Sequence, residues 1–246
     1  MIHWLIQEAQ AHPELVDGGH MLHANEQARL ATFKTEKRRQ DWLLGRWTAK
    51  RLIQDVLWRQ TGQLLALPEI EVRNGRRGDP IVSGYLSRMN GQLPVKELDS
   101  LVTLSVSHAH GHAFCALVER PSWPIGADME WIESRSEAFV ADYFTAAEQE
   151  RVSQAEGTMR DVLVTAVWSA KEAVLKALHL GLTVDTRCVE CLPPPLAERP
   201  FAWTPFTIDC EDGRLPQLAP PLTGWWRVWA NFVLTLVVGE DSRVVE

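Results

Sequence analysis

The sequence has few cysteines, no long apolar run and no excess of positive charge, and each absence argues against a class of protein. Four cysteines in 246 residues are too few to hold such a chain together, so we expect free thiols and no structural disulfide. No run of about 18 apolar residues is present that could span a bilayer. The N-terminal segment MIHWLIQEAQ lacks the charged start and apolar stretch of a signal peptide. We therefore expect a cytoplasmic protein of one or two domains.

The charge is uneven along the chain. A formal net charge of -7 argues against nucleic acid as the main partner, but residues 29–51 are basic, and three further arginines follow at positions 73, 76 and 77. A basic patch on an acidic protein indicates a phosphorylated or acidic ligand. For any single residue of the patch, the alternative is a solvated helix face.

The first part of the chain alternates between helical and extended patterns, with no short-period repeat. Apolar residues recur at helical spacing over 26–57, which predicts one long helix. Residues 70–72 form a short strand candidate that ends in the glycine-rich turn 74–80. Two further strands, 101–106 and 112–118, are predicted to pair through a tight connection around Gly111.

The segment PSWP at 121–124 marks the expected boundary between two halves. After it we predict a strand leading to Asp128 and three helices, with Gly181 ending the third as a C-terminal cap. The helices cover 136–144, 146–154 and about 160–180. A proline-rich loop is expected at 192–205, and apolar runs predict strands at 225–229 and 232–238.

Two stretches in this second half carry ionisable groups at spacings that bring them together. In WSAKEAVLK, Glu172 and Lys176 are four residues apart and share one face of a helix. In IGADME, Asp128 and Glu130 are two apart, so an extended backbone directs both to one face of a sheet. The alternative is two exposed strand residues and a surface pair worth about 0.3–0.5 kcal/mol.

Three converging carboxylates are the oxygen donors that Mg²⁺ prefers, and the ion usually keeps substrate phosphates in its remaining positions. Such an ion neutralises a pyrophosphate and orients it for phosphoryl transfer. The lysine can then meet a phosphate oxygen. The set therefore predicts a metal-dependent reaction on a phosphorylated substrate.

These residues resemble the motifs of the Sfp-type 4′-phosphopantetheinyl transferases. Gly126, Asp128 and Glu130 match the family's Gly-Ile-Asp-x-Glu segment. The Trp-x-x-Lys-Glu-Ala-x-x-Lys motif follows at 168–176. The stretch SVSHAHG at 105–111 is similar to a third motif, and NGRRGDP at 74–80 to the family's Gly-Lys-Pro turn, although Asp79 replaces its lysine.

The resemblance implies transfer of the phosphopantetheine arm of coenzyme A to a serine of an apo acyl or peptidyl carrier protein, releasing adenosine 3′,5′-bisphosphate. Asp128, Glu130 and Glu172 would hold Mg²⁺. Glu172, or a water held by Glu130, would take the serine proton, and Lys176 would stabilise the departing phosphate. The 3′-phosphate of coenzyme A would contact Arg29 and His108, with Arg77 a further candidate.

The resemblance also implies an α+β fold of two similar halves, 1–120 and 121–246, in a pseudo-two-fold arrangement with the active site in the cleft between them. The sequence alone does not show that the two halves are duplicates. Both sets of expected ligands lie in one chain, so a monomer is expected, without nucleic-acid or membrane partners.

Other interpretations remain. A metal-dependent nuclease also uses Asp, Glu and Lys, but typically places Glu and Lys two apart on a strand. A non-catalytic module that binds coenzyme A or carrier proteins would keep the binding residues without turnover. His108, His110 and His112 alternate as in a metal site, and Cys188 and Cys191 form a single CxxC pair. Without further ligands nearby in the sequence, neither set predicts a metal centre.

Overall fold

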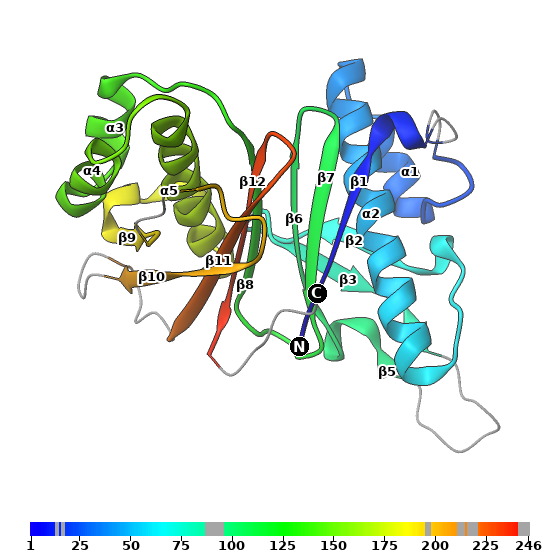
Figure 1. The fold of residues 1–246 in the computed structure, drawn as a ribbon. Helices are drawn as coiled ribbons and strands as arrows, with labels where there is room; N and C mark the ends of the chain where they lie inside the picture. The colour runs from blue at the N-terminus through cyan, green and yellow to red at the C-terminus, as the bar shows by residue number, and fades with distance from the viewer. Residues whose placement is uncertain are drawn as a thin grey trace. The chain divides into compact units, whose positions relative to one another are not determined.

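A computed structural model describes residues 1–12, 15, 18–86, 96–194, 198–210, 215 and 221–240. The described residues form two compact units, one ending at Trp123 and the other beginning at Pro124. Each unit combines helices with antiparallel strands (Figure 1), so the α+β class expected from the sequence is confirmed. Within the described ranges, no helix combines the length and the apolar character needed to cross a membrane.

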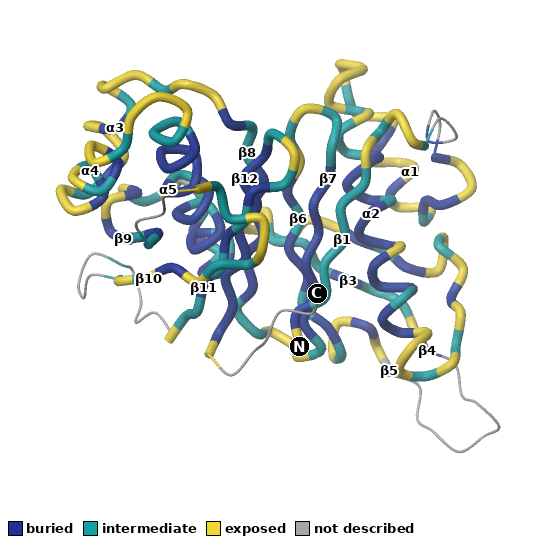
Figure 2. The backbone as a smooth tube through the Cα atoms, viewed as in Figure 1, coloured by how far each residue is buried: buried dark blue, intermediate teal, exposed yellow. Residues whose placement is uncertain are grey.

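The first unit is built on a three-stranded antiparallel sheet. Its order is β1 (Ile2–Glu8), β7 (His112–Val118) and β6 (Thr103–Ala109). The long helix α2 (Glu36–Thr61) packs against β7, β1 and β6. Buried residues of α2 and of β6 and β7 form a hydrophobic core, and Figure 2 colours the buried parts of these elements dark blue.

Shorter elements complete this unit. Helix α1 (Ala24–Leu30) contacts β2 (Glu71–Asn74), which pairs with β3 (Pro80–Ser83) across the glycine-rich turn. Strands β4 (Tyr85–Leu86) and β5 (Lys96–Glu97) form a separate pair.

The prediction of one helix over 26–57 was wrong, because the chain forms α1 and α2 with a break between them. At the break, Oγ1 of Thr32 donates to the carbonyl of Arg29 at 2.7 Å, a local bond that competes with helix continuation. Thr35 is extended, with φ −121° and ψ 139°. The basic residues of 29–51 are therefore divided between two helices.

The predicted pairing of 101–106 with 112–118 is confirmed as β6 and β7. Ala109 pairs with His112, which leaves His110 and Gly111 as a two-residue loop. Their φ angles are 47° and 73°, as a type I′ hairpin turn requires. His110 thus lies in the turn, and the three alternating histidines do not line one strand.

The second unit has a five-stranded antiparallel sheet in the order β8, β12, β11, β10, β9. The strands are β8 (Ile125–Trp131), β12 (Phe232–Gly239), β11 (Leu222–Trp229), β10 (Thr204–Cys210) and β9 (Val189–Leu192). The strands predicted at 225–229 and 232–238 are confirmed. The predicted loop at 192–205 joins β9 to β10, and its residues 195–197 lie outside the described residues.

Three helices follow β8, as predicted: α3 (Glu137–Tyr143), α4 (Ala146–Ser153) and α5 (Gly157–Ala177). Helix α5 packs on β8 and β12. The expectation that Gly181 caps this helix was wrong. The cap is a Schellman motif, in which His179 takes the left-handed φ of 54° and the amide of Leu180 donates to the carbonyl of Leu175 at 2.9 Å.

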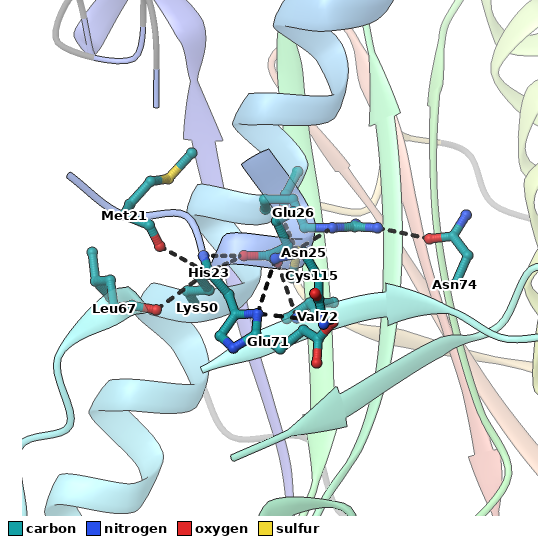
Figure 3. A network of polar contacts seen from close by, with 12 residues as sticks. Met21, His23, Asn25, Glu26, Lys50, Leu67, Glu71, Val72, Asn74 and Cys115 are labelled. Atoms are coloured by element: carbon teal, nitrogen blue, oxygen red, sulfur yellow. Dashed lines mark hydrogen bonds and ion pairs between the residues drawn. The ribbon is translucent and has the colours of Figure 1, made fainter. Parts of the chain in front are cut away.

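One buried ion pair recurs in both units. In the first unit, Glu26 near the start of α1 binds the ammonium of Lys50 from α2. Glu26 also accepts from the amide of Val72 in β2 at 3.0 Å, and Lys50 donates to the carbonyls of Met21 and Leu67 at 2.7 and 3.1 Å. Figure 3 shows these contacts around the ammonium.

The second unit has a similar arrangement, although both carbonyls that Lys171 reaches follow α5, whereas Met21 precedes α1. Glu148 near the start of α4 lies 2.8 Å from Nζ of Lys171 in α5 and accepts from the amide of Cys191 in β9 at 2.7 Å. Lys171 donates to the carbonyls of Thr186 and Val189. The two lysines end similar four-residue stretches, WTAK at 47–50 and WSAK at 168–171.

Candidate active site

Strand β8 directs two carboxylates toward helix α5, as the two-residue spacing predicts. Asp128 is buried, with 3% of its surface exposed, and Glu130 is partly exposed. Helix α5 carries Glu172 and Lys176 on the face that meets them. The amino group of Lys176 donates to Oδ1 of Asp128 at 2.6 Å and to the carbonyl of Ala127 at 3.3 Å. Strand and helix are therefore joined at the predicted site.

The close approach of α5 to β8 depends on Gly126. A Cβ atom at this position would lie 1.8 Å from the carbonyl oxygen of Ala173 and 3.0 Å from the amide nitrogen of Ala177. Both atoms belong to the backbone of α5, so no side-chain movement could make room. A glycine at this strand position brings the acidic and basic groups within contact distance.

The surroundings of Glu130 and Glu172 disfavour the charged forms of these two carboxyl groups. Burial, followed by repulsion from Asp128, raises the pKa of Glu130 to about 7, although Arg135, Trp168 and Lys176 oppose the shift. Burial and Asp128 also raise the pKa of Glu172, against the effect of Lys176. Three carboxylates thus share too little positive charge from the protein.

Aromatic side chains support the outer edge of this site. Trp168 donates a hydrogen bond to Glu130, and its ring centroid lies 5.1 Å from that of Phe139 and 5.3 Å from that of Tyr143, both on α3. The guanidinium of Arg135 lies over the Phe139 ring, 5.1 Å from its centroid, and reaches Glu130 at 3.7 Å. Trp168 therefore braces Glu130 as well as the helix.

The donor set is compatible with a divalent cation. In the part of the chain that is described, no three His, Cys, Asp or Glu side chains are placed as a ready metal site, and Lys176 contacts Asp128. However, Oε1 of Glu172 is buried without a hydrogen-bond partner among the described residues. A buried carboxylate oxygen with a raised pKa is stabilised by a nearby cation. Asp128, Glu130 and Glu172 thus fit Mg²⁺ by their chemistry.

Lys171, the motif residue before Glu172, has a different task. Its amino group is fully buried against Glu148 on the other side of α5. It therefore ties α5 to α4 and β9, whereas Glu172 and Lys176 face β8. Of these two adjacent motif residues, Lys171 therefore has a structural role, whereas Glu172 belongs to the candidate active site.

The first unit contains a cavity of about 300 Å³ that is lined by three arginines and by two glutamates, Glu26 and Glu71. Arg29 from α1, Arg46 from α2 and Arg73 from β2 line it, together with Trp42 and Asn74. The guanidinium of Arg46 lies over Trp42, 4.8 Å from the ring centroid, and donates to Oδ1 of Asn74 at 2.7 Å. Sequence reasoning named Arg29 but gave Arg46 and Arg73 no ligand role. In the sequence these two arginines stand out only as part of the basic region, and that pattern does not show which arginines line one cavity.

The other two predicted phosphate ligands lie elsewhere in this unit. His108 is an exposed residue of β6, and Arg77 is exposed in the turn between β2 and β3. Neither lines the cavity, and their assignment stays a prediction. In the same turn, the amide of Gly75 donates to the carbonyl of Asp79 at 2.7 Å, and the Asp79 carboxylate packs on Gly75. The aspartate that replaces the expected lysine therefore has a structural place.

All four cysteines are free thiols. Cys188 and Cys191 are buried beside β10, and burial raises the pKa of Cys191. A thiol with a raised pKa is a weak nucleophile and a weak metal ligand at neutral pH. The CxxC pair is thus placed as part of the core of the second unit.

Comparison with known proteins bears on the second unit. The family model of the 4′-phosphopantetheinyl transferase superfamily matches residues 124–214, a range that contains Asp128, Glu130, Glu172 and Lys176. The resemblance inferred from the motifs is therefore confirmed at the level of this superfamily. No curated protein sequence matches the chain significantly.

Several solved structures are similar over part of the chain. A holo-(acyl-carrier-protein) synthase from Bacillus anthracis, in complex with CoA (3′,5′-ADP), is 24% identical over 49% of this chain and 95% of its own, with a TM-score of 0.36. The synthase from Thermotoga maritima is 18% identical over 58% and 74%, with a TM-score of 0.37. The synthase from Helicobacter pylori, in complex with coenzyme A, is 15% identical over 48% and 98%, with a TM-score of 0.34.

Proposed function

We propose that this protein transfers the 4′-phosphopantetheine arm of coenzyme A to a serine of an apo carrier protein and releases adenosine 3′,5′-bisphosphate. The observation that carries the proposal is the meeting of Asp128, Glu130, Glu172 and Lys176 between β8 and α5. These four residues lie inside the segment that matches the transferase superfamily. The fold alone would not support a function.

Each of the four residues has a role in this reaction. Asp128, Glu130 and Glu172 would hold Mg²⁺, which supplies charge neutralisation at the pyrophosphate of coenzyme A. Lys176, which donates to Asp128 here, meets the phosphate oxygen that gains charge as the bond to the leaving group breaks. The proton of the carrier serine passes to Glu172 or to a water held by Glu130.

The cavity of the first unit takes the 3′-phosphate of coenzyme A in this proposal. Arg29, named by the family resemblance, and the newly found Arg46 and Arg73 supply the positive charge, and guanidinium groups bind phosphate through paired hydrogen bonds. His108 and Arg77 stay candidates for the same nucleotide. One chain carries both sets of ligands, so we expect a cytoplasmic monomer.

The test is intact mass spectrometry of apo acyl and peptidyl carrier proteins incubated with the protein, coenzyme A and Mg²⁺. We expect a gain of one phosphopantetheine group on at least one carrier, and no gain when EDTA is present. Coenzyme A binding without any gain over a broad carrier panel would instead support a non-catalytic binding module. The absence of both binding and transfer would refute the proposal.

A further inference from the structure

The recurring ion pair offers a comparison within one molecule between residues that the fold needs and residues added for a ligand. Lys50 and Glu26 correspond to Lys171 and Glu148. Counting from these lysines, Arg46 takes the position that Val167 occupies in the second unit. Val167 is a fully buried core residue, so the fold does not require a cation there.

Arg46 lies beside a buried carboxylate that could neutralise it. Its Nε atom is 3.8 Å from Oε1 of Glu26, and both side chains are at least nine-tenths buried. At such burial an ion pair is screened little by water, so a closer, hydrogen-bonded Arg46–Glu26 pair would neutralise the charge that Arg46 offers to the cavity.

Lys50 takes the closer contact with Glu26, so Arg46 forms only a longer ion pair without a hydrogen bond. The lysine ammonium contacts Oε2 of Glu26 as a hydrogen bond, whereas Arg46 lies beyond hydrogen-bond distance of the carboxylate. Two backbone carbonyls hold the ammonium in place, and the amide of Val72 takes Oε1. The carboxylate is therefore satisfied without the guanidinium.

Arg46 is left directed at the cavity. It donates to Asn74 at 2.7 Å, while its Nε is buried without a hydrogen-bond partner among the described residues. Asn74 corresponds to Pro193 when positions are counted from Val72 and Cys191, so the second unit has no side-chain acceptor there, and the carbonyl of Pro193 accepts from Arg151 instead. Arg46 and Asn74 are thus additions to the shared ion pair.

We propose that Lys50 is a positioning residue for phosphate recognition: by holding Glu26, it keeps the charge of Arg46 available to the 3′-phosphate of coenzyme A. This inference rests on the proposed function. Lys50 does not line the cavity and acts through Glu26 and Arg46. It makes the preference for coenzyme A over 3′-dephospho-coenzyme A depend on a fully buried lysine.

The test measures the affinities of both nucleotides by calorimetry in the presence of Mg²⁺. Lys50→Met removes the cation and leaves Glu26 to pair with Arg46. We expect coenzyme A affinity to fall by about ten-fold or more, the effect of losing one charged hydrogen bond. Affinity for 3′-dephospho-coenzyme A should change little, because that ligand has no phosphate for Arg46.

A second variant separates this role from loss of stability. In the double variant Lys50→Met with Glu26→Gln, no carboxylate competes for Arg46, so the preference for coenzyme A should return. Replacing both members of a buried pair is also tolerated better than removing one, and this variant decides the matter if Lys50→Met does not fold. A folded double variant without the preference would overturn the inference.

The matched control is the same exchange in the second unit, Lys171→Met with Glu148→Gln. Among the described residues, no arginine forms an ion pair with Glu148, so the ratio of the two affinities should stay within about two-fold of wild type. An equal loss of preference in the control would overturn the inference in favour of a general packing effect. Wild-type protein without a preference for coenzyme A would also overturn it, whereas the transfer reaction is judged separately by carrier mass.

Discussion

Gly126→Ala should move helix α5 away from strand β8 in the candidate active site. The added Cβ would lie 1.8 Å from the carbonyl oxygen of Ala173, whereas ordinary contact begins at 3.4 Å. Helix α5 must therefore move from β8 by about the difference, 1.6 Å. A shift of this size along the contact would take Lys176 out of hydrogen-bond range of Asp128, from which it is now 2.6 Å away.

Both activity and stability should change. A misplacement of about 1 Å in a catalytic group can cost about 100-fold in rate, so we expect transfer to fall by at least that factor. Overpacking of this kind costs about 1–3 kcal/mol of unfolding free energy. For a chain of about this length, each kcal/mol lowers the melting temperature by about 2–4 °C. Carrier mass spectrometry measures the first effect and thermal unfolding the second.

Gly45→Ala in α2 is the matched control. A Cβ atom there would lie 3.5 Å from a methyl carbon of Val106, which is ordinary contact. Alanine is favoured over glycine within a helix by about 1 kcal/mol, so this variant should be as stable as wild type or more so, with unchanged activity. If Gly126→Ala also kept wild-type activity and melting temperature, the tight contact of β8 with α5 could not be what positions the site.

Two further predictions concern groups whose pKa is raised by burial, Glu172 and the cysteine thiols. Glu172→Gln should lower transfer by about 100- to 10,000-fold, as expected for loss of a proton acceptor. It should leave the melting temperature equal or higher, because burial and Asp128 disfavour the carboxylate; wild-type turnover in this variant would remove Glu172 from the mechanism. At neutral pH, alkylating reagents should modify partly exposed Cys210, whose pKa burial raises to about 11, before the buried thiols Cys115 and Cys191. Peptide mapping reads the order, and rapid labelling of Cys191 in the folded protein would contradict its burial.

Much of the second unit could be predicted because its signals are local. The four-residue spacing of Glu172 and Lys176 fixes a shared helix face, and the two-residue spacing of Asp128 and Glu130 fixes a shared strand face. These periodicities hold whatever surrounds the element. What they could not give was the pairing itself, Lys176 with Asp128, which depends on how closely Gly126 allows the helix to approach.

The cavity proposed to bind the phosphate was less predictable because its parts come from distant segments. Arg46 and Asn74 are 28 residues apart and meet only after α2 and β2 have packed. Helical periodicity also joined two helices into one, since Thr32 and Thr35 break the backbone without a glycine or proline to mark the place. A charge pattern shows that a patch is basic, but tertiary packing decides which arginines face one ligand.

Comparing corresponding positions of the two units distinguishes residues that the fold needs from residues that differ between the units. Positions that agree, such as Lys50 with Lys171, form the same buried contacts and belong to the fold. Positions that differ beside them are where chemistry is added: Glu172 follows Lys171, whereas Arg51 follows Lys50. The carboxylate that would hold a metal ion thus has a cation, Arg51, at its counterpart, and in the proposed function the catalytic helix would be α5 rather than α2. The first unit instead places its added charge at Arg46, on the side of the helix that faces the buried ion pair.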